Sequence, residues 1–443
     1  MPSIKQAKDL LRPMGKSPLL HHTGLGILVG IITGLVVGLF RWIIDHTLVL
    51  LTIIYPFMKH HSVWLVLYII AIIVIVWLIA YLVQPYKTDL IGSGVPQLKA
   101  ILKGRHHMDW WQVLWRKFIS GLLTICPGLF LGREGPCIQI GACIGQGVEQ
   151  HFNHRQPDSK LLLACGAAAG LSAAFSAPLA GVVFLLEEIS HSFKAKLWLP
   201  ALAAAVSADL MTFLFFGSQP CLFLPIHHQL PLKVYPWLLL IGVITGIIAY
   251  LFQYCLFNLQ WWYRKFTIIP KRYHSILPLL LAIPVGLWNP RVLGGSHNLI
   301  TMVANFSLTK NWPSLLLLLL ILVVIRFIGT MIAYGSSVPG GIFMPIFVIG
   351  SLLGAIAGII LVHSGLIDES GYLTMIAMGM AAFFAATEGT PFSAILLVTE
   401  MVGSIEQVLP MTILVFIAYY TSILLGARPS LYDALLENMN FED

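Results

Sequence analysis

The amino-acid sequence predicts an all-α, polytopic membrane protein with two inverted structural repeats and broken helices. Three observations predict this fold class. The composition is strongly apolar, since 58% of the 443 residues are hydrophobic and only 10% are charged, whereas soluble chains carry about 25% charged residues. Apolar runs recur along the whole chain, and the second half echoes the first. So many runs exclude a signal peptide followed by a soluble domain.

The apolar runs are long enough to cross a bilayer. A transmembrane helix needs about 20 apolar residues, and the run from Ser62 to Val83 supplies them without one charge. Similar runs lie near residues 25–40, 161–186, 199–216, 235–257, 273–288, 312–325, 341–362, 371–387 and 409–426. We therefore expect a multi-pass protein of the cell's inner (plasma) membrane, surrounded by the lipid bilayer.

The formal net charge of +7 fits a membrane protein that handles anions. Basic loops usually mark the cytoplasmic side of a membrane, and a basic balance raises the local concentration of anions. The Lys and Arg residues cluster between the apolar runs, at Lys5, Lys8, Arg12, Lys16, Lys99, Lys103, Arg105, Arg116 and Lys117. We expect a cytoplasmic N-terminus and no nucleic-acid partner.

Two blocks of the first half recur in the same order in the second half. The first block pairs Lys117 with Arg326, Gly132 with Gly341, Pro136 with Pro345 and Gly141 with Gly350. The second block pairs Gly166 with Gly379, Pro178 with Pro391 and Glu187 with Glu400. A constant spacing over so many positions is hard to obtain from helix-packing motifs alone. We expect an N-terminal cytoplasmic segment (1–22), a first membrane repeat (23–230), a second membrane repeat (231–436) and a short tail (437–443).

Three short segments carry the candidate binding chemistry: GSGVP (92–96), GREGP (132–136) and GGIFMP (340–345). Each opens an apolar helical stretch. A helix N-terminus presents unpaired N–H groups and a positive dipole end, which together hold an anion. Duplicated membrane halves usually bind their substrate where broken helices meet. One Gly/Pro segment alone is more often only a turn, so the prediction depends on the three together.

Glu134 lies inside the second of these segments, within an apolar region. A carboxylate at membrane depth is costly, and it is a functional candidate by default. The alternative is a structural ion pair with Arg133 or Lys117.

With these motifs, the chain resembles the CLC family of chloride channels and chloride/proton exchangers over about residues 23–436. A tyrosine in PSLYDALL, Tyr432, completes the pattern. The resemblance implies a CLC-type fold and a homodimer with one pore per subunit. It also implies that Glu134 is the external gating glutamate, whose carboxylate occupies an anion site when ionised and leaves it when protonated. Glu188 matches the internal proton-transfer glutamate of the family.

The resemblance also implies a chloride site. Ser93 and Tyr432 would bind the ion through their hydroxyls, and Ile342 and Phe343 through their backbone N–H groups. From the residues alone, Ser93 is as well explained as a helix cap, and Tyr432 as an interfacial aromatic residue. Lys117 and Arg133 are expected to support the site electrostatically without touching the ion.

These expectations favour transport of chloride in exchange for protons, with chloride and protons as partners. The alternative is a passive, voltage- or pH-gated chloride channel on the same fold. Glu188 favours the exchanger, because plain channels of the family commonly carry a non-titratable residue there, whereas we expect the neighbouring Glu187 to face water. Since the chain ends soon after Tyr432, we expect a prokaryotic-type member without cytoplasmic regulatory domains.

An intramembrane enzyme is the alternative from another class, and it would need a nucleophile with a base or a metal cluster. Neither H-E-x-x-H nor G-x-S-x-G occurs. We expect no enzymatic activity, no metal and no cofactor.

Overall fold

The computed structural model describes residues 18–152, 160–226, 229–265, 267–308 and 311–439. The basic residues Lys5, Lys8, Arg12 and Lys16, and so most of the predicted N-terminal segment, lie outside these ranges. The described helices of the first half are α2 (Pro18–His60), α3 (Ser62–Val83), α4 (Lys87–Leu90), α5 (Val95–Leu102), α6 (Trp110–Ile125), α7 (Glu134–Phe152), α8 (Leu161–Phe175), α9 (Pro178–Phe184) and α10 (Ala195–Phe216).

The described helices of the second half are α11 (Tyr235–Lys265), α12 (Ile276–Trp288), α13 (His297–Ala304), α14 (Trp312–Gly335), α15 (Phe343–His363), α16 (Gly371–Glu388), α17 (Pro391–Val402), α18 (Val408–Leu424) and α19 (Leu431–Glu437). Short helical turns add η2 (Gln84–Tyr86), η3 (Leu185–Ile189), η4 (Leu232–Val234), η5 (Lys271–Tyr273) and η6 (Pro290–Val292). Within the described residues the only β-pairing is two isolated bridges. The predicted all-α class is confirmed.

Seven of the described helices are long and apolar enough to cross a membrane, and α8, α17 and α18 are shorter apolar helices. The apolar run 161–186, which was predicted as one stretch, forms two helices in the structure, because the chain breaks between α8 and α9. Ser176 ends α8 with a φ of 53°, and Ala177 is not helical. The residue before a proline is disfavoured in the helical conformation, so Pro178 explains why a new helix starts there.

Paired glycines pack the helices of each half in the same way. A Cβ on Gly141 would clash with the carbonyl of Gly166, and a Cβ on Gly166 would clash with that of Gly141. Their counterparts in the repeat, Gly350 and Gly379, contact each other in the same manner. Only a residue without a side chain permits such a close approach of two helices. Helices α7 and α8 therefore cross as α15 and α16 do.

A pair of acids links the two halves reciprocally. Glu187 accepts hydrogen bonds from the N–H groups of Phe392 and Ser393, at 3.2 and 2.7 Å, at the start of α17. Glu400 accepts from the N–H groups at the start of α9, at 3.1 and 2.7 Å. Two halves related by a twofold axis produce such a reciprocal pair of contacts. Glu187 is therefore not simply a water-facing acid, because it occupies the positive end of a helix.

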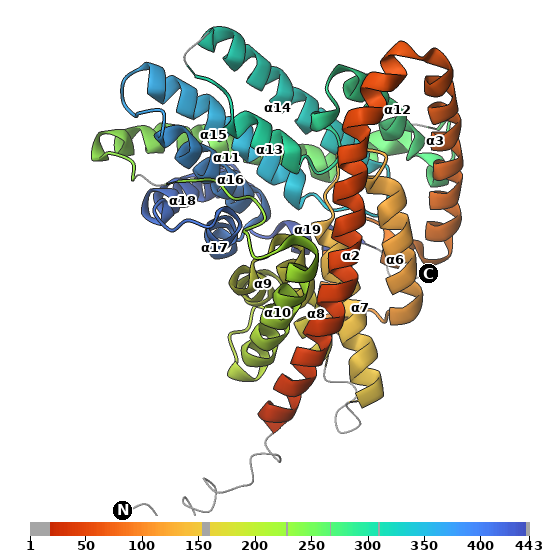
Figure 1. The fold of residues 1–443 in the computed structure, drawn as a ribbon. Coiled ribbons are helices and arrows are strands. Elements are labelled where there is room, and N and C mark those ends of the chain that lie inside the picture. The colour runs from red at the N-terminus through yellow and green to blue at the C-terminus, as the bar shows by residue number, and fades with distance from the viewer. Residues whose placement is uncertain (1–17, 153–159, 227–228, 266, 309–310, 440–443) are drawn as a thin grey trace, which may run out of the picture.

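The helices gather into neighbouring groups, with α7, α8, α9 and α10 on one side, α15, α16, α17 and α18 on another, and α19 between them (Figure 1). The two groups also touch directly, through α9 and α17 and through α7 and α15.

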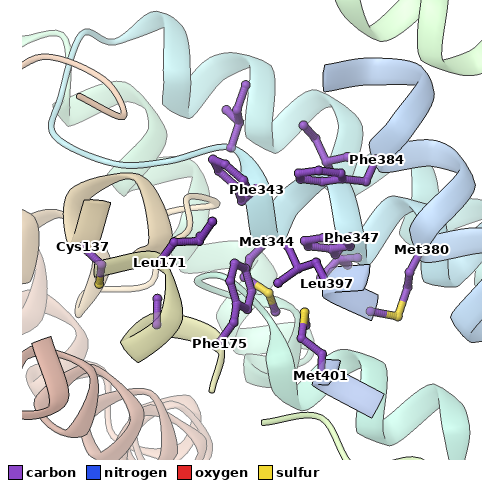
Figure 2. Packing of buried hydrophobic residues seen from close by; sticks show 14 of the residues in the cluster. Cys137, Leu171, Phe175, Phe343, Met344, Phe347, Met380, Phe384, Leu397 and Met401 are labelled. Carbon is purple, nitrogen blue, oxygen red and sulfur yellow. The ribbon is translucent and has the colours of Figure 1, made fainter. Parts of the chain in front are cut away.

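Aromatic side chains pack around the start of α15, as Figure 2 shows. Phe347 stacks on Phe384 of α16 with ring centroids 4.4 Å apart, and Phe343 packs against Phe384 at 5.2 Å. Phe175 at the end of α8 meets Phe347 edge to face at 5.8 Å. This buried cluster fixes the position of the α15 N-terminus relative to both halves.

Candidate functional site

The glycine–proline segment before α15 is hydrogen-bonded to each of the other two. Gly92 donates its N–H to Val338 at 3.0 Å, and Gly340 donates to Gly92 at 3.1 Å. Gly132 and Gly341 exchange two hydrogen bonds, of 2.7 and 2.8 Å. These bridges tie together the starts of α5, α7 and α15. Three helix N-termini, with their unpaired N–H groups, are thereby brought into one region.

The junction is so tight that only glycine fits at its centre. A Cβ on Gly135 would lie 2.6 Å from Cβ of Ser93, and a Cβ on Gly341 would lie 2.9 Å from the backbone N of Gly135. Both distances are shorter than a Cβ atom keeps from any non-bonded heavy atom. The glycines therefore allow the backbone to approach closely where an anion is expected.

Glu134 begins α7 and is only 1% exposed. Its Oε2 atom has no hydrogen-bond partner among the described residues. The backbone amide of Met344, in the first turn of α15, faces this carboxylate. A Cβ on Gly132 would overlap Oε2 and lie 3.2 Å from the amide nitrogen of Met344. The acid thus occupies space between the N-termini of α7 and α15.

Of the two cations expected near Glu134, Lys117 is engaged elsewhere, and Arg133 is shared between Asp45 and Glu134. Arg133 forms its short ion pair with Asp45, and its Nε atom is 4.0 Å from the Glu134 carboxylate. Lys117 donates to the carbonyls of Leu90 and Gly92, at 2.9 and 2.8 Å. Glu134 therefore keeps a long ion pair with Arg133, whose closer partner is Asp45.

Lys117 is fully buried on α6, so its assignment to a basic loop was wrong. Its ammonium holds the backbone that leads into Ser93. Arg326, its counterpart in the repeat, does the same for another segment, donating to Val292 at 3.0 Å and to Gly294 at 2.7 Å. Lys117 and Arg326 therefore each hold a backbone segment in place through its carbonyl groups.

Glu188 lies in the turn η3 and is 1% exposed. Lys99 donates to its Oε1 atom at 2.8 Å, and Ser430 donates to the same oxygen at 2.6 Å. Lys99 is also fully buried, and it lies 2.9 Å from Asp433. Lys99 is therefore a buried ion-pair partner, and not the loop residue that the sequence indicated.

The structure places the predicted chloride ligands as follows. Ser93 is buried, and its hydroxyl accepts from the N–H of Val95, the first residue of α5, at 3.3 Å. Ile342 and Phe343 form the N-terminus of α15. Tyr432 is fully buried, with its ring stacked on that of Phe343 at a centroid distance of 6.0 Å. Helix α19, which carries Tyr432, packs on α5.

Glu388 is a buried acid at this site that sequence reasoning missed. It ends α16, is 0% exposed, and accepts a hydrogen bond of 3.3 Å from the hydroxyl of Tyr432. The sequence did indicate this acid. Glu388 directly follows the apolar run 371–387, and it stands where the first repeat has Phe175.

A basic cavity of about 890 Å³ reaches Ser93 from the surface. Its described lining contains four cations and no acidic residue; the cations are Lys87, Arg264, Lys271 and Arg272. Such a lining concentrates anions. Ser336 and Ser337 on the loop before α15, and Leu435 and Asn438 near the end of the chain, form other parts of its wall.

Within the described residues no group of three or more His, Cys, Asp and Glu side chains could hold a metal ion. The six cysteines are free.

Comparison with known proteins gives consistent matches along most of the chain. The family model described as voltage gated chloride channel matches residues 75–423. The H(+)/Cl(-) exchange transporter ClcA of Vibrio cholerae serotype O1 is 32% identical over 364 residues, 80% of this chain and 76% of that protein. ClcA of Yersinia pestis bv. Antiqua is 33% identical over 368 residues, with coverages of 80% and 74%. A solved structure of a slow cyanobacterial Cl-/H+ antiporter superimposes with a TM-score of 0.86 at 28% identity, covering 95% of this chain and 98% of that one.

Proposed function

Since the chain belongs to the voltage gated chloride channel family, we propose that it exchanges chloride for protons across the membrane. Its relatives named above are exchangers of these two ions by their names. The proposal does not rest on the names alone, because the buried acids of this chain supply a physical basis for coupling.

The observation that carries the proposal is the place of Glu134. Its carboxylate lies between two helix N-termini, where an anion would also be stabilised. It is buried, and one oxygen lacks a partner. An ionised Glu134 and a chloride compete for the same N–H groups, whereas a protonated Glu134 loses its preference for them. Each proton bound therefore favours the entry of one anion.

Glu188 supplies the second proton position. It is buried on another segment, and ion pairs lead from it through the buried Lys99 and the half-buried Asp433 to the exposed Lys103. A proton route through Glu188 can be separate from the anion route past Ser93. Two separate routes distinguish an exchanger from a channel with one continuous pore. The passive channel remains the second candidate, on the same fold.

For the anion, we assign the hydroxyls of Ser93 and Tyr432 and the N–H groups of Ile342 and Phe343 as ligands, and the one O–H of Tyr432 turns from Glu388 to the anion when it binds. Neutral donors hold a halide without the full charge of a cation, so the ion can also leave. Lys117 and Arg133 support the site without binding the ion. Lys117 holds the Gly92 carbonyl, and Arg133 pairs with Asp45. The basic cavity in front of Ser93 delivers the anion.

We further propose a homodimer with one pore per subunit, seated in the inner membrane, with no enzymatic activity. The division into repeats 23–230 and 231–436 is part of the same proposal. It is supported by the reciprocal contacts of Glu187 and Glu400 and by the equivalent glycine pairs.

Reconstituted liposomes test the function. With a chloride gradient across the membrane and no proton gradient, the protein should move protons in the direction opposite to chloride and build a pH difference. The anion gradient collapsing without any pH change, with the membrane potential clamped, would instead identify a passive channel.

A further inference from the structure

Glu388 is a third buried carboxylate, and the exchange described above does not use it. Tyr432 donates to its Oε1 atom at 3.3 Å, while its Oε2 atom has no partner among the described residues. Two hydroxyls on either side of it, those of Thr387 and Thr390, are buried without partners as well. Buried polar atoms are normally satisfied by protein or by ordered water. The end of α16 therefore carries a cluster of buried polar atoms without partners among the described residues.

The surroundings of Glu388 do not suit a permanent negative charge. No Lys, Arg or His in the described residues pairs with it, and the nearby Lys99 is bonded to Glu188 and Asp433. A buried carboxylate without a cation is very costly in its ionised form, and such a group takes up a proton instead. A protonated Glu388 can still accept from Tyr432 through its carbonyl oxygen. Its own O–H then remains available to pass a proton on.

A short segment of the chain connects Glu388 to Glu188. Ser430, which donates to Glu188, precedes α19, and Tyr432, which donates to Glu388, lies in its first turn. A Cβ on Gly389 would lie 3.3 Å from the Cα of Ser430, so the end of α16 touches this segment. The charges of Glu188 and Glu388 act on each other. Residues 430–432 thus bring the two acids together, and Tyr432 links one of them to the anion site.

We infer that Glu388 is a further proton-binding residue of the exchange, placed between Glu188 and the anion site at Tyr432. This inference rests on the proposed function. In the transfer, the carboxyl of Glu388 gives its proton towards the carboxylate of Glu134, and the Glu388 carboxylate left behind takes the proton of a protonated Glu188. A chloride at Tyr432 would repel the charged form of Glu388, because like charges repel strongly in a low dielectric. Anion occupancy therefore controls when the proton moves.

Three proteins test this: the wild type, Glu388→Gln and Glu388→Asp, each reconstituted in liposomes with proton and chloride fluxes recorded together. Glutamine has nearly the same shape and can still accept the hydrogen bond of Tyr432, but it cannot carry a proton. We expect Glu388→Gln to lose proton transport while chloride transport continues. We expect Glu388→Asp, which can titrate, to restore proton transport at least in part.

The outcomes separate the two proposals. A wild type that never moves protons against their gradient defeats the proposed exchange itself. A coupled wild type with an equally coupled Glu388→Gln defeats only the role of Glu388, and shows that the acid merely orients Tyr432. Loss of coupling in both variants also defeats the role, because it shows that the shape of the Glu388 side chain matters and not the proton that it carries.

Discussion

The Lys99 ammonium lies 2.8 Å from the Glu188 carboxylate, and both side chains are buried. A buried ion pair is costly to assemble and contributes little to stability by itself. Its presence beside Ser430, on the segment that leads to Tyr432, therefore suits a role in transport, in which Lys99 keeps Glu188 hydrogen-bonded and oriented for proton exchange.

Replacing this acid tests the inner proton route. Glu188→Gln keeps the shape of the side chain, and Lys99 retains Asp433 as a charge partner at 2.9 Å, so the fold should survive. We expect proton flux in liposomes to be lost while chloride flux continues. Glu187→Gln is the matched control, since the adjacent acid contacts α17 instead, and it should keep its coupling. Equal coupling in Glu188→Gln and the wild type would remove Glu188 from the proton route.

Removing one hydroxyl tests the anion site. Tyr432→Phe keeps the stacking on Phe343 but loses a donor, which is worth about 1 kcal/mol for a typical hydrogen bond. We expect the chloride affinity measured by isothermal titration calorimetry to fall roughly fivefold. Tyr372→Phe is the control, because that buried hydroxyl donates to the carbonyl of Val303 at 3.0 Å. Equal affinities in the two variants would exclude the Tyr432 hydroxyl as a ligand.

The cations of the basic cavity should act through their long-range field. We expect the double variant Lys271→Gln/Arg272→Gln to transport chloride more slowly than the wild type at low ionic strength. The difference should shrink at about 1 M salt, because the screening length there is about 3 Å. Lys194→Gln/Lys196→Gln serves as the control, since both lysines are exposed and neither lines the cavity. A salt-independent defect would indicate a structural cause.

The reciprocal contacts of Glu187 and Glu400 should stabilise the fold. Glu400→Gln weakens two hydrogen bonds at the α9 N-terminus and removes a charge that favours the helix dipole. We expect a loss of about 1 kcal/mol in unfolding free energy, seen as a lower midpoint in thermal unfolding in detergent. Glu369→Gln, at an exposed loop acid, should leave the midpoint in place. An unchanged midpoint in Glu400→Gln would mean that the contact adds nothing.

Sequence patterns predicted those features that local chemistry determines. Apolar runs predicted the helical membrane class, and the duplicated glycine–proline segments predicted which helix starts meet. Glu134 could be found because an acid is conspicuous inside an apolar motif. These signals depend on spacing along the chain, which a sequence displays directly.

Other features depend on contacts between distant segments. Lys99 and Lys117 looked like loop cations, yet their ammonium groups are buried against partners that become neighbours only on folding. Glu187 was expected to face water, but its partner helix lies about half the chain away. Glu388 stood at the end of an apolar run, where an acid usually marks an exposed helix end, and only the burial of Tyr432 beside it reveals its position.

Bromide diffraction offers the most direct test of competition between Glu134 and an anion. Crystals of the wild type and of Glu134→Ala, both grown in bromide at neutral pH, would be compared by anomalous scattering. We predict a bromide peak beside the Met344 amide in Glu134→Ala, at the place where the carboxylate lies in the wild type, and no peak there in the wild type. The absence of bromide at that place in Glu134→Ala would contradict the proposed exchange mechanism.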